Sequence, residues 1–326
     1  MTLILVRKLL RDLRYALLVV GVLLLAFSAL WTKIAQRITT EIAPFFNGIA
    51  TMSNINPKLM DEVIFKGPGK IAQSVMGGAN VRFEKPSDFL AVELMHPVVL
   101  FVCGLWVIGR AAGAVSGEID KGTMELLMSQ PVPRSRLIVA HFLVDCLVIP
   151  CLCLCILGGT QLGLELIGPF KVDYSVLDKL TADAPIRFKP PRGPDVLEVS
   201  ASRQIWGLVN LASLMFAFSG ITMMISSSGR SRWRTAGWAA LIYILMFVIN
   251  VIGQLWDQAA IARPFSLFFY YQPQKIWLLG EWNVNMSEAW PGAGTLPVVP
   301  FLLGLGFLGY GLAYRIFTRR DLPAPL

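Results

Sequence analysis

The sequence predicts an all-α polytopic membrane protein, and three observations support this prediction. Of the 326 residues, 55% are hydrophobic and only 15% are charged, whereas about one quarter of the residues of a soluble domain are charged. Several apolar stretches reach the roughly 20 residues that a helix needs to cross a bilayer. The surplus positive charge gathers at alternate ends of these stretches. This pattern excludes a disordered chain, a disulfide-framed secreted domain and almost any ordinary cytosolic enzyme.

Six segments pass the length test for a transmembrane helix. They lie near 13–32, 97–116, 137–167, 205–227, 236–256 and 296–316. The third is long enough to tilt or kink, and it contains Pro150. Residues 1–326 therefore form a single transmembrane domain, with outer loops at 33–96, 168–204 and 257–295.

The distribution of Lys and Arg sets the expected orientation. With the N-terminus inside, the inner segments and adjoining helix ends hold 14 cations and five anions, whereas the outer loops hold 15 cations and 14 anions. We therefore expect both termini on the cytoplasmic side of the cell (inner) membrane. Short cationic clusters at span ends suit anionic lipid headgroups. They lack the contiguous, aromatic-rich pattern of a nucleic-acid surface, so no nucleic-acid partner is expected.

The first span is expected to be retained, because its apolar run exceeds a signal-peptide core and no small-residue cleavage site follows it. In the preceding segment, 1–12, and at the start of the span, Arg7, Arg11 and Arg14 share one helical face and an apolar stripe lines another. This pattern predicts an interfacial helix on the cytoplasmic leaflet. The alternative is a first span that simply extends into water.

The third outer loop contains a segment that suits neither a span nor a solvated loop. Residues 264–280 (PFSLFFYYQPQKIWLLG) are aromatic and apolar but are interrupted by a proline. Because irregular backbone at membrane depth is tolerated only inside protein or along a cavity, we expect a re-entrant hairpin before the last span. Its candidate residues for an outer gate are Phe268, Phe269, Tyr270, Tyr271 and Pro273.

Arg110 and Asp145 are the costly residues inside spans. Each lies about two helical turns from the cytoplasmic end of its span, so antiparallel neighbouring helices would place both at the same depth. The sequence therefore predicts an intramembrane ion pair, and a structural clamp is favoured over a substrate ligand.

Five cysteines lie inside apolar runs, so no disulfide framework is expected: Cys103, Cys146, Cys151, Cys153 and Cys155. Alternate residues of a helix point about 200° apart, so of the last three only Cys151 and Cys155 share a face. Packing is favoured over soft-metal binding, and no metal site is predicted. The two histidines, His96 and His141, are expected to make local hydrogen bonds.

The most informative segment lies between the second and third spans. Acidic residues precede a short apolar helix at 123–128, which Pro131 and Pro133 terminate. A short helix with an apolar face at this place suits docking in a groove on a soluble partner. The alternative is a plain turn between helices.

The residues of this segment resemble the signature of ABC transporter permeases with type-2 (exporter) membrane domains. The matching residues are Glu118, Lys121, Gly122, Thr123, Glu125, Leu126, Leu127, Pro131, Arg134 and Leu137. Residues 89–100 resemble the lead-in of the nitrous-oxide-reductase-maturation-like branch. The six-span plan and the aromatic hairpin also match, so the resemblance covers nearly the whole chain. His141, where many relatives have Lys, and the enlarged second outer loop depart from the pattern.

The resemblance implies the permease subunit of an ATP-binding-cassette transporter, an exporter in which the segment is a coupling helix that contacts a separate ATPase subunit. The chain has no G-x-x-x-x-G-K-[ST] motif, so no catalytic residue is expected in it, and ATP with Mg²⁺ is expected on two partner ATPase chains. A second permease chain, identical or a sister, would complete the path. Two alternatives stay open: a membrane component of a gliding, secretion or maturation complex, and a secondary transporter.

Overall fold

The computed structural model describes residues 2–52, 85–129, 133–175, 178 and 193–321. Within these ranges, six helical segments are long and apolar enough to cross a membrane, as the sequence predicts. Their principal helices are α1 (Thr2–Arg37), α6 (Pro97–Ala114), α9 (Arg134–Ile167), α11 (Gln204–Ser228), α12 (Arg232–Leu255) and α14 (Val298–Arg319). The chain is therefore an all-α multi-pass membrane protein.

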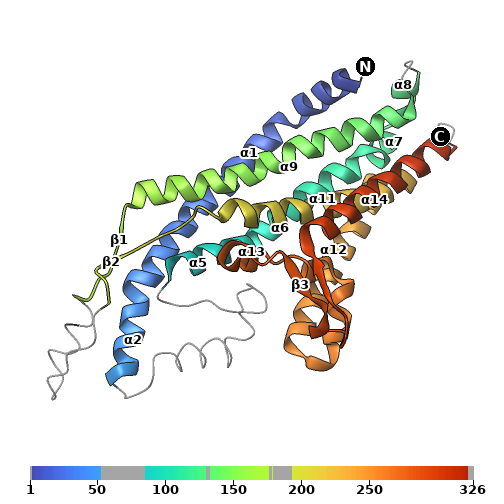
Figure 1. Ribbon diagram of the computed structural model, residues 1–326. Helices are drawn as coiled ribbons and strands as arrows, with labels where there is room; N and C mark the ends of the chain where they lie inside the picture. Colours follow the sequence, from blue (N-terminus) through green and yellow to red (C-terminus); the bar gives the residue numbers. More distant parts are fainter. Residues whose placement is uncertain (1, 53–84, 130–132, 176–177, 179–192, 322–326) are drawn as a thin grey trace.

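Short elements gather at the two ends of this bundle (Figure 1). One end holds both chain termini and the segment between α6 and α9, which forms α7 (Ser116–Asp120) and α8 (Met124–Met128). The opposite end holds η1 (Ile38–Ile42), α2 (Ala43–Met52), α5 (Pro86–Val92), η2 (Glu93–Met95), β1 (Phe170–Lys171), β2 (Val196–Leu197), η3 (Asp257–Phe265), η4 (Leu267–Phe269), α13 (Pro273–Leu279), β3 (Asn283–Asn285), η5 (Met286–Glu288) and β4 (Thr295–Pro297). The strands form two small antiparallel pairs, β1 with β2 and β3 with β4. Val284 faces Leu296 at the centre of the second pair.

The first span is longer than predicted at both of its ends. The segment 1–12, expected as a separate interfacial helix, is instead continuous with α1, and a π-helical turn, η1, joins α1 to α2. Val6 is buried, and leucines of the same stripe pack against the protein core rather than being left for a membrane surface. Much of the expected outer loop 33–96 is therefore helical, because residues up to 52 and from 86 to 95 continue the adjoining spans.

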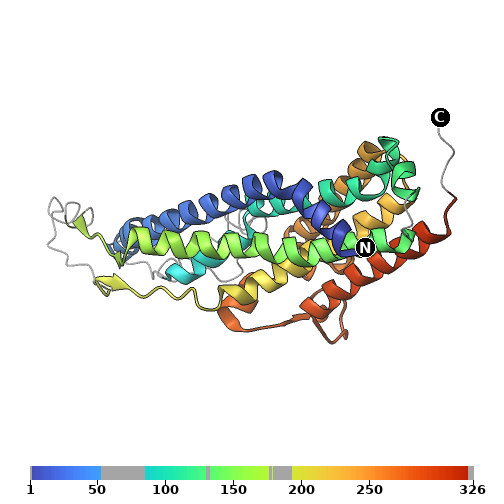
Figure 2. The same cartoon turned by 90° about the horizontal axis from the view of Figure 1, so that it is seen from above.

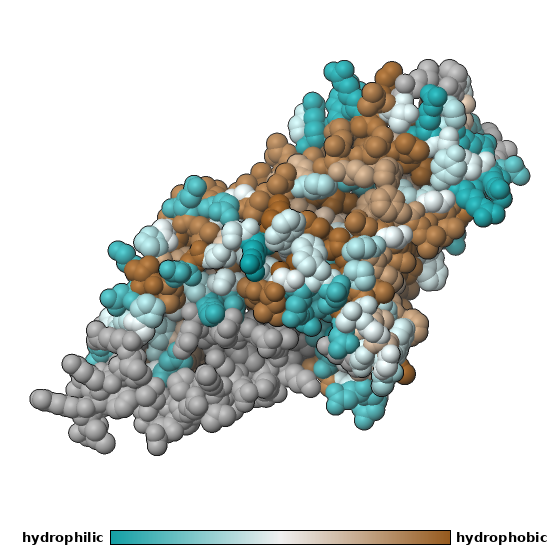
Figure 3. All heavy atoms as spheres, in the orientation of Figure 1, coloured by the Kyte–Doolittle hydropathy of each residue, from teal (hydrophilic) through white to brown (hydrophobic). Residues whose placement is uncertain are grey.

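The core of the bundle lies around α11, most of whose residues are buried. It packs along α14 on one flank and along α6 on another. The long helices α1 and α9 run side by side, as Figures 1 and 2 both show. In contrast, α1 and α12 expose apolar side chains such as Leu18 and Ile244. Apolar residues cover much of the surface of the long helices in Figure 3, and polar side chains gather at the end that holds α7 and α8. Such a distribution suits helices that face lipid.

Glycines set the closest helix contacts. A Cβ atom added at Gly220 of α11 would lie 3.0 Å from the Cα atom of Gly306 on α14, and Gly309 meets Gly220 in the same way. On the other side of the bundle, a Cβ atom at Gly159 of α9 would lie 2.7 Å from the Cβ atom of Ser28 on α1. Small residues allow apolar helices to approach closely where no water drives them together.

We expect Gly309→Ala to destabilise the protein by about 1–3 kcal/mol, because the added methyl group meets the backbone of α11. Gly311→Ala is the matched control on the same helix, since a Cβ atom there has nothing within 4 Å. Thermal unfolding of the purified variants in detergent measures the difference. Equal midpoints for the two variants would contradict the close contact between α11 and α14.

Candidate functional site

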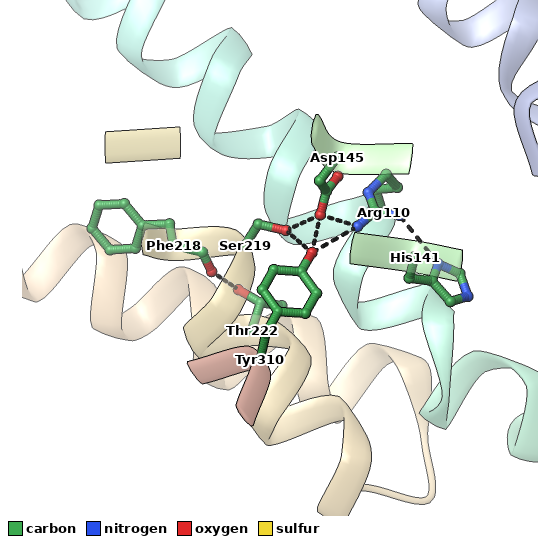
Figure 4. Close-up of polar contacts among 7 residues, drawn as sticks. All are labelled: Arg110, His141, Asp145, Phe218, Ser219, Thr222 and Tyr310. Atoms are coloured by element: carbon green, nitrogen blue, oxygen red, sulfur yellow. Dashed lines mark hydrogen bonds and ion pairs between the residues drawn. The ribbon is translucent and has the colours of Figure 1, made fainter. Parts of the chain in front are cut away.

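A buried ion pair joins four of the long helices. Arg110 of α6 donates through Nη2 to Oδ2 of Asp145 on α9, and both side chains are almost wholly inaccessible to solvent. The same oxygen accepts from Ser219 Oγ of α11 at 2.5 Å and from the hydroxyl of Tyr310 on α14. Figure 4 shows these three donors converging on one carboxylate oxygen. The structure thus brings together the two residues that the sequence pairs, and it adds two partners.

Further contacts fix the orientation of the guanidinium group. Arg110 Nη1 lies 3.1 Å from Nδ1 of His141, which accepts the hydrogen bond as a neutral imidazole, and Nη2 lies 3.3 Å from the Tyr310 hydroxyl. The Ser219 and Tyr310 hydroxyls are 3.2 Å apart. A buried pair is tolerated when opposite charges meet and hydrogen bonds satisfy most of the polar atoms. Among the described residues, Arg110 Nε and Asp145 Oδ1 are the atoms of the pair that have no hydrogen-bond partner. This geometry supports a clamp that holds α6, α9, α11 and α14 in one arrangement.

Sequence reasoning missed Ser219 and Tyr310. Each is one of several polar residues in a mostly apolar span, and polarity inside a span is the signal that singled out Asp145. Hydroxyl groups are common in spans because they can bond to their own helix, so that signal does not identify which ones join a network.

A cavity of about 410 Å³ lies beside the ion pair between α9, α11 and α14. Its lining is apolar apart from Asp145 and Ser213, and includes Ile149, Leu208, Phe216 and Phe307. Because the lining is mostly apolar and Arg110 already balances the charge of Asp145, the space suits an alkyl or aromatic group rather than a second ion.

The segment between α6 and α9 is a compact turn built by its own motif residues. Gly122 has φ +71°, a left-handed conformation that favours glycine. The Thr123 hydroxyl donates to Glu118 Oε2 at 2.6 Å, and the Thr123 amide donates to the Glu118 carbonyl at 3.0 Å. Met124 is buried and anchors the start of α8. Glu118, Gly122 and Thr123 therefore shape the turn.

Other motif residues face outward. Leu126 is 71% exposed, and Lys121 and Glu125 are also exposed. Leu127 is half-buried. The exposed Leu126 follows Glu125, so α8 presents an apolar side chain close to exposed charged residues. Pro131 lies outside the described residues.

The turn is bonded to the ends of several spans. Ser226 Oγ of α11 accepts from the amides of Val115 and Ser116 at 3.2 and 3.1 Å, which caps the break between α6 and α7. Asp120 Oδ2 accepts from the amide of Arg232 at the start of α12 at 3.2 Å. The helix α11 itself continues to Ser228.

Arginines complete this set of contacts. Arg134 Nη1 at the start of α9 donates to the carbonyl of Arg320 at 2.6 Å. Arg320 Nη1 in turn donates to the carbonyls of Ser227 and Gly229 at 3.0 and 2.9 Å. The end of α14 is thereby bonded to both α9 and the α11–α12 turn.

The aromatic segment at the other end is irregular and buried. Phe268, Phe269, Tyr270 and Tyr271 are all inaccessible or nearly so, and Pro273 begins α13. Phe268 packs against Phe218 of α11 and Phe247 of α12. This burial matches the expectation that the segment packs between spans.

Side chains from the spans satisfy the backbone of this segment. The Tyr271 hydroxyl donates to the Leu94 carbonyl at 2.6 Å, and Asn210 of α11 accepts from the Gln272 amide at 2.8 Å. Ser266 Oγ donates to the Met246 carbonyl of α12 at 2.6 Å. Burial raises the pKa of Tyr271 well above its ordinary value, so its hydroxyl keeps the proton that it donates. Non-helical backbone at this depth requires such partners.

Cysteines and histidines show no arrangement typical of a metal centre. Within the described ranges, no group of three or more His, Cys, Asp or Glu side chains is placed to hold an ion. Cys103 and Cys153 are buried, whereas Cys146 and Cys151 are exposed on α9. His96 caps α6 by accepting from the Val98 amide at 3.2 Å.

We expect Asp145→Asn to destabilise the protein by about 3 kcal/mol, because it leaves the Arg110 guanidinium buried without a counter-charge. A double-mutant cycle with Arg110→Gln isolates the pair. The double variant should be more stable than the sum of the two single effects predicts, as measured by thermal unfolding in detergent. Additive effects would rule out a clamp between these two residues.

Comparison with known protein families gives one match. The family model described as "ABC-2 family transporter protein" matches residues 6–182, which is more than half of the chain and extends from α1 past the end of α9. No curated protein and no solved structure matches the chain.

Proposed function

The chain belongs to the ABC-2 family of transporter proteins, and from this premise we propose that it is the permease subunit of an ATP-binding-cassette exporter driven by an ATPase on a separate chain. The observation that carries the proposal is the outward face of α8, with Leu126 71% exposed, on a turn bonded to the ends of the spans. We propose that this face is the coupling helix that contacts the ATPase.

The shape and charge of α8 support docking. A short helix offers an exposed apolar side chain to a groove, and the flanking charges of Lys121 and Glu125 provide orientation. The Glu118–Thr123 hydrogen bonds and the buried Met124 hold the turn before any partner arrives. Such preorganisation lowers the entropic cost of binding.

The hydrogen bonds behind α8 give a physical route for motion. Ser226 links the α6–α7 break to α11, and Asp120 links α7 to α12. Arg134 and Arg320 connect the start of α9 to the end of α14 and to the α11–α12 turn. A displacement of α8 by the ATPase would therefore move several span ends together rather than one loop.

The proposed assembly has two permease chains, identical or sister chains, and two ATPase chains that bind ATP with Mg²⁺ and hydrolyse it. The proposed location is the cell inner membrane with both termini in the cytoplasm. Two observations support that orientation: the termini lie at the end that holds α7 and α8 (Figure 1), and the cations are in excess there. Placement in the nitrous-oxide-reductase-maturation-like branch rests on residues 89–100 alone and belongs to the same proposal.

We further propose that the aromatic segment gates the outer end of the path. The Tyr271 hydroxyl joins it to η2 at the start of the second span, and Asn210 joins it to α11. Because these bonds attach the segment to η2 and α11, a shift of either element changes the position of the segment. The ion pair, in contrast, is proposed as a fixed clamp.

Leu126→Asp is expected to weaken co-purification of the ATPase by about tenfold or more, because it removes the apolar anchor of the interface. Val196→Asp is the matched control: Val196 is 47% exposed and lies at the opposite end of the molecule. The measurement is the amount of ATPase retained with the tagged chain after purification from membranes. ATPase retention equal to that of the control would refute the coupling-helix assignment. Leu126 is a sharper target than Glu118, whose carboxylate bonds within the turn.

Tyr271→Phe is expected to raise the basal ATPase rate of the reconstituted complex, because the aromatic segment loses its bond to the Leu94 carbonyl. ATPase retention should stay unchanged, since the substitution lies far from α8. Tyr314→Phe, at an exposed tyrosine of α14, is the control. An unchanged basal rate in Tyr271→Phe would argue against the gate.

A further inference from the structure

A second buried polar cluster lies near the end of the bundle opposite α8 and takes no part in the proposed function. It consists of four side chains from four elements: Ser28 of α1, Glu93 of η2, Thr160 of α9 and Gln204 of α11. All four residues are completely inaccessible to solvent. Gln204 Nε2 donates to Thr160 Oγ1 at 2.7 Å. The Thr160 hydroxyl lies 3.2 Å from both Glu93 Oε2 and the Ile156 carbonyl, and it can donate its proton to either.

This cluster is left with unsatisfied oxygens. Glu93 Oε1, Gln204 Oε1 and Ser28 Oγ have no hydrogen-bond partner among the described residues. Ser28 lies beside the Glu93 carboxylate without completing a bond of normal geometry. Buried polar atoms in proteins are nearly always partnered, so three such oxygens in one cluster call for a further partner, which can be a water, a proton or an ion. All three are oxygens that can accept or coordinate.

The charge of Glu93 also requires a further partner for this cluster. Within the described part of the chain no Lys, Arg or His pairs with this carboxylate, whereas Arg110 balances Asp145. An isolated carboxylate away from water is strongly unfavourable unless a cation or a proton neutralises it. Either a proton on the Glu93 carboxyl group or a bound cation would therefore neutralise the cluster.

Glu93 lies next to a break in the second span. The second span is broken here: η2 ends at Met95, His96 is extended with ψ 134°, and α6 begins at Pro97. Discontinuous spans are where membrane transporters coordinate small cations. On the facing side, Gly159 allows α1 to approach α9 closely enough to bring Ser28 beside Thr160.

We propose that Ser28, Glu93, Thr160 and Gln204 form a binding site for a monovalent hard cation, Na⁺. The donor set is one carboxylate, two hydroxyls and one amide oxygen, which suits a hard cation and excludes a soft metal. Its single negative charge balances a monovalent ion, whereas a divalent ion would leave an uncompensated buried charge. The site joins α1, η2, α9 and α11, so occupancy stabilises this end of the bundle. This inference goes beyond the proposed function and does not depend on the ATPase.

The test measures thermal unfolding of the purified chain in detergent, in NaCl against the same concentration of choline chloride. Na⁺ should raise the midpoint of the wild-type chain by about 2–4 °C. Glu93→Gln, which keeps the shape of the side chain and removes the charge, should abolish this Na⁺-dependent shift.

A second pair of variants keeps the test decisive if Glu93→Gln does not fold. Thr160→Val should reduce the Na⁺-dependent shift, whereas Thr222→Val should retain it. Thr222 is the matched control because it is equally buried in a span and bonds only to the Phe218 carbonyl of its own helix.

Two outcomes would overturn the proposal. If Na⁺ does not shift the wild-type midpoint and Glu93→Gln is as stable as the wild type, Glu93 is a neutral carboxylic acid that shares its proton within the cluster. If Glu93→Gln or Thr160→Val keeps the full Na⁺-dependent shift, the cation binds elsewhere.

Discussion

A carboxylate removed from water must find its partners within the protein, and Asp145 meets this constraint by collecting them from three other helices. Arg110, Ser219 and Tyr310 reach the same oxygen from α6, α11 and α14. Because each donor must arrive at hydrogen-bond distance, the requirement fixes the depth and rotation of all four helices at once. Apolar packing alone does not fix the depth or rotation of a helix in a membrane, because lipid tails are as apolar as the side chains that they contact. The close glycine contact between α11 and α14 lies on the same pair of helices and holds them at the short separation that the Tyr310 contact needs.

The same constraint explains the two irregular ends of the bundle. At one end, the break between α6 and α7 exposes amides that Ser226 of α11 satisfies. At the other, the aromatic segment has a backbone that Asn210 and Tyr271 satisfy. In both places a side chain of one element forms a hydrogen bond with the backbone of another element. Each end is therefore held together internally and is bonded to the neighbouring helices.

The sequence predicts the fold well because the signals for spans are local. Apolar length and terminal charges locate the third to sixth spans to within a few residues. The first span extends beyond both of its predicted ends, and the helical segment of the second begins at Pro86, well before its predicted start. The interfacial helix was predicted from an amphipathic stripe, but a stripe does not reveal whether lipid or another helix covers it; here the protein core does. The Arg110–Asp145 pairing followed from equal depth, whereas Ser219, Tyr310 and the Glu93 cluster depend on helix neighbours far apart in the sequence. Pairing of that kind is tertiary information, which periodicity and composition do not contain.

The uninterrupted rod from α1 through η1 to α2 has a geometric consequence. At about 1.5 Å per residue it is about 75 Å long, more than twice the roughly 30 Å of a hydrocarbon core. The continuous helix is therefore too long to lie within the hydrocarbon core and extends beyond it. A partner that contacts its end would bind at a fixed distance from the lipid surface. The π-helical turn at Ile38–Ile42 adds a residue to one turn and rotates the face that α2 presents relative to α1. Insertion or deletion of single residues on either side of this turn would turn the tip about the rod axis while barely changing its height.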